Sequence, residues 1–485
     1  MTKQKSIKLN MAMNFLLTIS NTLFPMITYS YVARVLSPTG TGKVAFVESI
    51  LAYFLFIASL GIPAYGRREA AKVRDNKEQL SHLIQELFIL NLGSTIIAYV
   101  LSWIIVLSIP RFRGYELLFF IMGGQILLKL VGMEWLYEGI EEYTYITIRS
   151  LIFKMCSVVL TFVLIRDPDD VIWYGFVHVF TVSASYVCNF LNAKRYISIH
   201  KTGKYDLKRH IKPIMMLFSA SVAITIYANF DVSMIGFIST EQEVGLYNAA
   251  LKIKTLVLAV STAVTAVLVP RVSYYFHNGE REKIISLLSK SIRISLLIAT
   301  PIAMYVFIYS ENVLAFIGGS DYIFAANTLR TLMLCVFALI ITNLCGAQIL
   351  IPAGKEKRYT QSVLGGLFIN LILNMQLIPR MGAFGAAIGT LITEIWNVIW
   401  MGRGCLDYIK PLIQRVAFKE YIIPLIFSML GSYIVSLKLA NFTVFWQLAI
   451  TTVMSFGCYY LALTWRKEPL IKEITEKIIK KFKRT

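Results

Sequence analysis

The sequence predicts an all-α integral membrane protein with about 14 transmembrane helices. Its 485 residues are 56% hydrophobic and only 16% charged, and its mean hydropathy is +0.63, which is far from the composition of soluble globular domains. The apolar residues also form continuous runs of roughly 20 residues, the length that a helix needs to cross a hydrocarbon core about 30 Å thick. Strands of a membrane barrel would alternate in polarity over only about 10 residues.

Fourteen such apolar segments follow one another along the chain. In order they cover residues 9–33, 44–66, 83–108, 116–137, 144–165, 171–193, 213–238, 245–270, 294–310, 331–353, 360–379, 384–402, 420–437 and 442–465. The glycine-rich stretch SPTGTGKV at 37–44 lies between the first two. It lacks the glycine spacing and the Ser or Thr after the lysine that a phosphate-binding loop requires, so we interpret it as a connection between helices.

Lysine and arginine are unevenly distributed over the connections. If the N-terminus is inside, the inner connections carry 35 of these residues and the outer ones 8, so both termini are expected in the cytoplasm. The remaining five fall within the spans. The formal net charge of +20 is therefore mostly a signal of membrane orientation and of contact with anionic lipids, and no nucleic-acid partner is expected.

The connections and spans lack the features of a membrane enzyme. No outer connection exceeds about 20 residues, which leaves little room for a loop that carries an active site. The spans contain no zinc-protease motif, nucleophile elbow or dense Asp cluster, and the six cysteines have no metal-ligand spacing. We therefore expect no catalytic residues, no metal and no cofactor, and we expect a transporter rather than an enzyme.

Matching segments indicate an internal repeat. Gly42 and Gly245 occupy similar connections 203 residues apart, and WLYEGIEEYTY at 135–145 resembles LIPAGKEKRYT at 350–360. A parallel repeat of six helices predicts two lobes around a central cavity. The predicted parts are an N-terminal lobe at 1–193, a basic cytoplasmic linker at 194–212, a C-terminal lobe at 213–402, two extra helices at 403–465 and a basic amphipathic tail at 466–485.

Cations within the spans are candidates for a transport site. A charge at the centre of a membrane helix costs about 2.5–3.5 kcal/mol on insertion scales, so it usually faces a cavity or a partner. The residues predicted to line the cavity are Lys129, Arg149, Lys154 and Lys252. Arg149 also lies close enough to an inner turn to reach the membrane surface instead.

Other polar residues in the spans extend this prediction. On the first span, Asn10, Asn14 and Asn21 share one face and are predicted to line the cavity, with hydrogen bonding between helices as the alternative. Three carboxylates, Asp231, Glu394 and Glu134, are candidates for salt bridges with the cations, which is the favoured role. Alternatively they couple transport to a proton or sodium gradient, because burial can raise a carboxyl pKa toward the working pH.

Five stretches also carry a family resemblance. They are PMITYSYVARVLSPTGTGKVAFVESILAYFLFIASLGIPAYGRREAA, MEWLYEGIEEYTYI, DVSMIGFISTEQEVGLYNAALKI, LVPRVS and GAFGAAIGTLITE. Together they resemble the bacterial oligosaccharide and polysaccharide repeat-unit flippases of the multidrug, oligosaccharidyl-lipid and polysaccharide exporter superfamily. The resemblance implies a multi-pass protein of the bacterial plasma membrane that moves undecaprenyl-diphosphate-linked oligosaccharides to the outer leaflet by alternating access, for O-antigen, capsule or exopolysaccharide assembly.

The resemblance also implies partners and leaves alternatives. The expected partners are the lipid-linked oligosaccharide, membrane lipids, and a polysaccharide polymerase with its chain-length regulator. The alternatives within the same superfamily are a flippase for a cell-wall precursor lipid and a multidrug exporter. A membrane glycosyl polymerase is disfavoured by the short outer connections.

Overall fold

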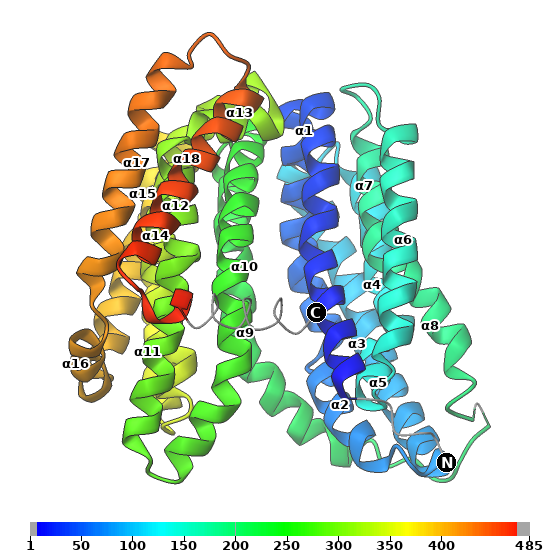
Figure 1. The fold of residues 1–485 in the computed structure, drawn as a ribbon. Coiled ribbons are helices and arrows are strands. Elements are labelled where there is room, and N and C mark those ends of the chain that lie inside the picture. The colour runs from blue at the N-terminus through cyan, green and yellow to red at the C-terminus, as the bar shows by residue number, and fades with distance from the viewer. Residues whose placement is uncertain (1–6, 199, 473–485) are drawn as a thin grey trace, which may run out of the picture. The chain divides into compact units, whose positions relative to one another are not determined.

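The computed structural model describes residues 7–198 and 200–472, and the elements in this part of the chain are helices (Figure 1). Contacts divide the chain into two compact units, residues 1–245 and 246–485. We describe each unit by itself. Most of the predicted amphipathic tail, from residue 473 onward, lies outside the described residues.

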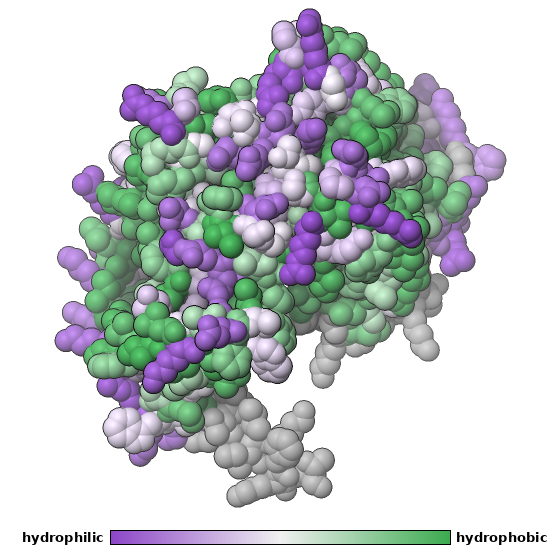
Figure 2. Space-filling view, turned by 90° about the horizontal axis from the view of Figure 1, so that it is seen from above, coloured by the Kyte–Doolittle hydropathy of each residue, from purple (hydrophilic) through white to green (hydrophobic). Residues whose placement is uncertain are grey.

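Helices long and apolar enough to cross a membrane make up most of both units. Ten described helices pass this test, and the bent helix at 208–238 is an eleventh. The protein is therefore an all-α multi-pass membrane protein, as predicted, while the count of 14 spans stays a prediction. Figure 2 shows one face seen from above, where hydrophilic and hydrophobic residues are mixed.

The first unit begins with a helical hairpin. α1 runs over Ile7–Ser59 but is broken at Ser37, which has a φ of 58° and is followed by Pro38. Figure 1 shows the dark blue start of α1 and the helix α2 (Ile62–Val73) at the same end of this unit, so the chain reverses at the break. The stretch SPTGTGKV is thus a helix connection, as predicted. We call the end that carries α2 the α2 end.

The remaining elements of the first unit pack around this hairpin. α3 starts where Asn76 accepts hydrogen bonds from the backbone N–H groups of Glu78 and Gln79, a common helix cap. The elements are α3 (Lys77–Ser108), η1 (Pro110–Phe112), α4 (Glu116–Gly132), α5 (Glu134–Gly139), α6 (Tyr143–Leu164), α7 (Val171–Val179), η2 (Phe180–Ala184), α8 (Ser185–Ala193), α9 (Lys208–Ile238) and the first turn of α10 (Glu241–His277). α1 contacts α3, α4, α6 and α9, so it is the central hairpin of the unit.

The connection after α9 packs against the break in α1, and a glycine on each side, Gly245 and Gly42, allows the close approach. A Cβ added at Gly42 would lie 1.8 Å from the carbonyl oxygen of Glu241, and one added at Gly245 would lie 1.9 Å from that of Pro38. Because 203 residues separate both Gly42 from Gly245 and Pro38 from Glu241, the contact is reciprocal, as in a two-fold symmetric interface. This contact explains why α9, which the repeat assigns to the C-terminal lobe, packs with the N-terminal helices.

The second unit contains a similar hairpin. α15 covers Glu356–Gly402 and is broken at Gly382, which has a φ of 54°. Ser362 donates to Asn397 across the two arms at 2.8 Å, so the arms are antiparallel. The other elements are α10 from residue 246 onward, α11 (Arg281–Leu297), α12 (Ala299–Ile308), α13 (Ser310–Gly318), η3 (Ser320–Ala325), α14 (Ala326–Asn343), η4 (Leu344–Leu350), α16 (Leu406–Arg415), α17 (Phe418–Lys438) and α18 (Val444–Trp465).

The glycine contact makes a prediction about stability. We expect Gly42→Ala to destabilise the protein by roughly 1–3 kcal/mol, since the backbone of two connections must separate to admit the methyl group. Gly93→Ala is the matched control, because an added Cβ there meets nothing within 4 Å. Thermal unfolding in detergent measures both variants. An unchanged midpoint for Gly42→Ala would mean that the two connections are not held in this contact.

Candidate functional site

The fourth predicted span is interrupted at Met133, near the α2 end. Met133 has a φ of 38° and separates α4 from α5. The preceding Gly132 packs against the ring of Tyr186, where an added Cβ would lie 3.0 Å away, and its carbonyl accepts a hydrogen bond from Asn189. Broken helices at membrane depth are tolerated where they are buried in protein or line a cavity.

Arg149 and Glu134 form an ion pair beside this break. Their closest nitrogen and oxygen atoms are 2.9 Å apart, and the Arg149 side chain is only 5% exposed whereas that of Glu134 is 42% exposed. The guanidinium also donates to the carbonyl oxygen of Ser185 at 3.3 Å and lies 5.8 Å from the ring centroid of Tyr145. Arg149 is thus held inside the helical bundle, and its place in a transport cavity stays a prediction.

The two predicted lysines of this unit have neutral partners. The ammonium group of Lys129 lies 5.4 Å from the ring centroid of Tyr186, a geometry in which a cation is attracted to the ring face. Lys154 is buried on α6 and donates hydrogen bonds to Ser20, at 2.8 Å, and to Asn21 on α1. These partners are uncharged, while the carboxylates of Glu134 and Glu138 line the same cavity as Lys129.

The first-span asparagines differ in exposure. Asn14 and Asn21 are exposed, whereas Asn10 is buried. No described residue donates a hydrogen bond to the side-chain oxygen of Asn10. Of the three, only Asn21 is joined to a predicted cation, by its contact with Lys154.

The remaining predicted residues lie elsewhere. Asp231 is half-buried on α9, and Lys252 is half-buried on α10 in the second unit. Glu394 is buried in the hairpin of α15, where its carboxylate and the amide nitrogen of Asn397 are 3.5 Å apart. The structure thus brings together Lys129, Glu134, Arg149 and Lys154 within the first unit, whereas Lys252 and Glu394 belong to the second unit.

A cavity of about 110 Å³ adjoins the helix break. Its walls come from the end of α1 and the start of α2, from α3, from both sides of the break, and from α8. Lys129, Glu134 and Tyr186 line it, together with Asn91 and Trp135. Sequence reasoning missed Asn91, Trp135 and Tyr186, because a single amide or aromatic side chain in an apolar span carries no signal until the helix break and the neighbouring helices are known.

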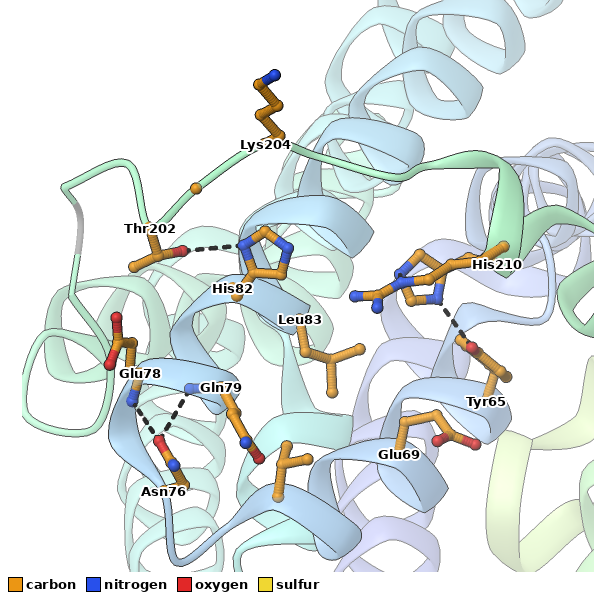
Figure 3. A pocket seen from close by; sticks show the side chains of 13 residues that line it. Tyr65, Glu69, Asn76, Glu78, Gln79, His82, Leu83, Thr202, Lys204 and His210 are labelled. Carbon is orange, nitrogen blue, oxygen red and sulfur yellow. Dashed lines mark hydrogen bonds between the residues drawn. The ribbon is translucent and has the colours of Figure 1, made fainter.

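A larger cavity of about 830 Å³ lies at the α2 end, between α2, the start of α3 and the connection at 202–210 (Figure 3). Figure 3 shows Tyr65 hydrogen bonded to His210. Glu86 is fully buried and accepts hydrogen bonds from His210, at 2.9 Å, and from Arg209. Because these contacts hold the first turn of α9 against α3, we assign this cluster an anchoring role and not a transport role.

Comparison with known proteins identifies relatives over most of the chain. A family model described as polysaccharide biosynthesis protein matches residues 7–276, and a model described as MatE matches residues 217–375. A protein of Escherichia coli K12 named "Putative O-antigen transporter" is 22% identical over 380 residues, which cover 77% of this chain and 91% of that protein.

Two solved structures share the fold. The lipid II flippase MurJ in an inward closed conformation aligns with a TM-score of 0.68 at 16% identity, over 96% of this chain and 100% of that chain. An inward-facing multidrug resistance MATE family transporter of the MOP superfamily aligns with a TM-score of 0.60 at 14% identity, over 84% of this chain and 99% of that chain. Because the sequence identities are this low, the two alignments show only that the fold is shared.

The Arg149–Glu134 pair makes a second prediction about stability. Glu134→Ala leaves a buried guanidinium without its carboxylate, which we expect to cost roughly 1–3 kcal/mol; the value lies below that of a wholly buried pair because Glu134 is partly exposed. Glu282→Ala is the control, since the Arg415–Glu282 pair has the same 2.9 Å distance with side chains 44% and 79% exposed and should contribute little. Thermal unfolding measures both losses.

A double variant tests the cause of this loss. In Glu134→Ala/Arg149→Met the unpaired charge is gone, so much of the lost stability should return. If the double variant is less stable than Glu134→Ala by the full cost of Arg149→Met alone, the two side chains are not energetically coupled.

Proposed function

The chain belongs to the family of polysaccharide biosynthesis proteins, and from this membership we propose that it is a flippase for undecaprenyl-diphosphate-linked oligosaccharide repeat units. It would move them across the bacterial plasma membrane for O-antigen, capsule or exopolysaccharide assembly. The name of the Escherichia coli relative, an O-antigen transporter, supports this substrate class. Its partners would be membrane lipids and, after transfer, a polysaccharide polymerase with its chain-length regulator.

The observation that carries the proposal is the pair of lysines with neutral partners. Lys129 lies against the ring of Tyr186, and Lys154 against Ser20 and Asn21. Basic groups at membrane depth favour an anionic ligand, and a diphosphate supplies two neighbouring anionic groups. Arg149 already has a carboxylate partner, so its role is to hold Glu134 and the helix break in place.

Transport would proceed by alternating access. The polar headgroup would enter from one side of the membrane, contact the lysines in place of water, and leave on the other side after the helices rearrange. The prenyl chain would stay in the surrounding lipid, since its transfer into a polar cavity is unfavourable. No bond of the substrate is made or broken in this cycle, so the protein would act as a transporter and not as an enzyme.

Other members of the superfamily offer two alternatives. A flippase for a cell-wall precursor lipid would use the same charge arrangement with a different sugar. A multidrug exporter that binds cationic compounds would favour carboxylates in excess at membrane depth, whereas three cations and two carboxylates, Glu134 and Glu138, lie near the helix break. We therefore favour a lipid-diphosphate substrate.

The distribution of basic residues predicts the orientation. Both termini, the α2 end and the connections at 201–205 and 278–281 should face the cytoplasm, because the basic residues gather there. Single cysteines introduced at Gly203 and Asn278 should react with a thiol reagent only after the membrane is made permeable. Strong labelling by an impermeant reagent in intact cells would contradict this orientation.

The lysines make a prediction about transport. Lys129→Ala and Lys154→Ala should each lower the amount of surface polysaccharide at least about tenfold, the equivalent of losing one charge-assisted contact. Arginine at either position should retain part of the activity because it keeps the charge. Lys438→Ala, at an exposed position in α17, should leave export unchanged. Full export by both alanine variants at normal protein abundance would contradict a role in headgroup binding.

A further prediction concerns the energy source of transport. We propose that Asp231 or Glu394 binds a proton or sodium ion in one state and releases it in another, because a transporter without a coupled gradient only equilibrates its substrate. Asp231→Asn or Glu394→Gln should then remove the response of flipping to an imposed gradient in reconstituted vesicles while substrate binding persists. An unchanged response in both variants would favour removal of product by downstream polymerisation as the driving force.

A further inference from the structure

A polar cavity of about 640 Å³ lies in the second unit, apart from the helix break at Met133. Its walls are the end of α10, the start of α11, the turn between η4 and α15, and the first turn of α16. The charged or titratable side chains that line it are those of His277, Arg281, Lys355 and Asp407. This volume lies within the roughly 300–1,000 Å³ that is typical of small-molecule sites.

The walls of the cavity lie where the chain enters or leaves the membrane. Four helical segments that begin or end beside the cavity or beside α16 are long and apolar enough to cross a membrane, namely Arg281–Ile308, Ser320–Leu350, Glu356–Gly402 and Phe418–Lys438. The turn between η4 and α15 and the helix α16 each connect two of these spans. Because the ends of spans lie at the boundary of the hydrocarbon core, the cavity lies at the level of the lipid headgroups.

α16 has the pattern of a helix that lies on the membrane surface. Figure 1 shows it at one end of α17. Leu406 and Ile413, seven residues apart, share one face of the helix and are 47% and 57% exposed, whereas Leu412 is buried. Lys410 is exposed. An exposed apolar edge with a lysine nearby is typical of helices that contact acyl chains and headgroups together.

Two cations of the cavity are held in place by neighbouring backbone groups. Arg281 donates a hydrogen bond of 2.8 Å to the backbone carbonyl of Asp407, and its guanidinium lies 5.9 Å from the ring centroid of Tyr408. The backbone N–H of Lys355 donates to the carbonyl of Leu350 at 2.8 Å, which closes the turn before α15. These contacts fix both residues at the cavity wall.

The charges of the cavity are not paired with one another. Nearby, Arg415 and Glu282 form an ion pair at 2.9 Å. Among the described residues, neither Arg281 nor Lys355 forms an ion pair, and the carboxylate of Asp407 forms none. All three are exposed, so a ligand can reach them. Two cations and one carboxylate in one cavity complement a ligand that carries both an anionic and a cationic group.

We propose that this cavity binds the headgroup of an aminophospholipid, of which phosphatidylethanolamine is the simplest. Its phosphate would contact Arg281 and Lys355, because guanidinium and ammonium groups form strong, charge-assisted hydrogen bonds with phosphate. Its primary ammonium would donate to the carboxylate of Asp407. The acyl chains would lie along Leu406 and Ile413. This lipid would be a bound membrane component and not the transported substrate, so the site does not depend on the proposed function.

Three lipids with identical acyl chains test the assignment. The full-length protein is purified in detergent and freed of lipid, and its affinities for phosphatidylethanolamine, phosphatidylglycerol and phosphatidylcholine are measured. Phosphatidylglycerol keeps the phosphate but has no ammonium, and the quaternary ammonium of phosphatidylcholine has no hydrogen to donate. We expect phosphatidylethanolamine to bind about fivefold more tightly than either, the effect of one charge-assisted hydrogen bond at an exposed site.

Two variants separate the anionic and cationic ends of the headgroup. Asp407→Asn should abolish the preference for phosphatidylethanolamine and bind phosphatidylglycerol at least as tightly as the wild type does, which also shows that the variant is folded. Lys355→Ala should weaken binding of all three lipids about fivefold, because each carries the phosphate.

Matched control variants lie near the cavity but outside it. Lys357→Ala removes an exposed lysine two residues after Lys355, and Glu420→Gln neutralises an exposed carboxylate in the first turn of α17. Neither residue lines the cavity, so both variants should keep the wild-type affinities and the wild-type preference.

Soluble phosphoethanolamine distinguishes a lipid from a free headgroup. It has no acyl chains, so we expect it to bind at least about a hundredfold more weakly than the lipid. Equal affinity for the soluble compound and the lipid would overturn a membrane lipid as the ligand.

Other outcomes would overturn the headgroup assignment. Equal affinity of the wild type for the three lipids, tighter binding of phosphatidylglycerol than of phosphatidylethanolamine, or an unchanged preference in Asp407→Asn would each do so. These outcomes would leave the flippase proposal standing, because Lys129 and Lys154 do not line this cavity.

Discussion

The structure depends on one constraint, which is that a charged or polar side chain at membrane depth must have a partner inside the protein. Water is absent there, so each unsatisfied group costs several kcal/mol. Arg149 meets this requirement with Glu134, the carbonyl of Ser185 and the ring of Tyr145. Because Arg149 lies on α6, Glu134 on α5 and Ser185 on α8, the charge connects three helices around the break.

The same constraint separates two kinds of charge in the first unit. Arg149 is neutralised by a carboxylate, so its contribution is mainly structural. Lys129 and Lys154 contact an aromatic ring, a hydroxyl and an amide, which orient the ammonium groups without themselves carrying a negative charge. This difference gives a physical reason to assign ligand binding to the lysines and positioning to the arginine, although all three are basic residues within spans.

Breaks in the helices place these groups where they can act. The αL conformation of Met133 divides one span into α4 and α5, and the cavity with Asn91 forms beside this break. The reversals at Ser37 and Gly382 divide the two long helices into hairpins. At Gly42 and Gly245 the two connections approach so closely that neither residue can carry a side chain. The two glycines that match each other in the predicted repeat therefore meet in one backbone contact.

The sequence by itself determined the membrane class, the connection at 37–44 and the cations to examine. These follow from local quantities: the length of apolar runs, turn-forming residues, and the cost of a charge in a span. Only the tertiary structure decided that Arg149 pairs with Glu134, that Lys154 contacts Ser20 and Asn21, and that Asn91 faces a cavity with no described donor. Such contacts join helices far apart in the chain, and helical periodicity gives the face of each helix without giving the neighbour that this face meets.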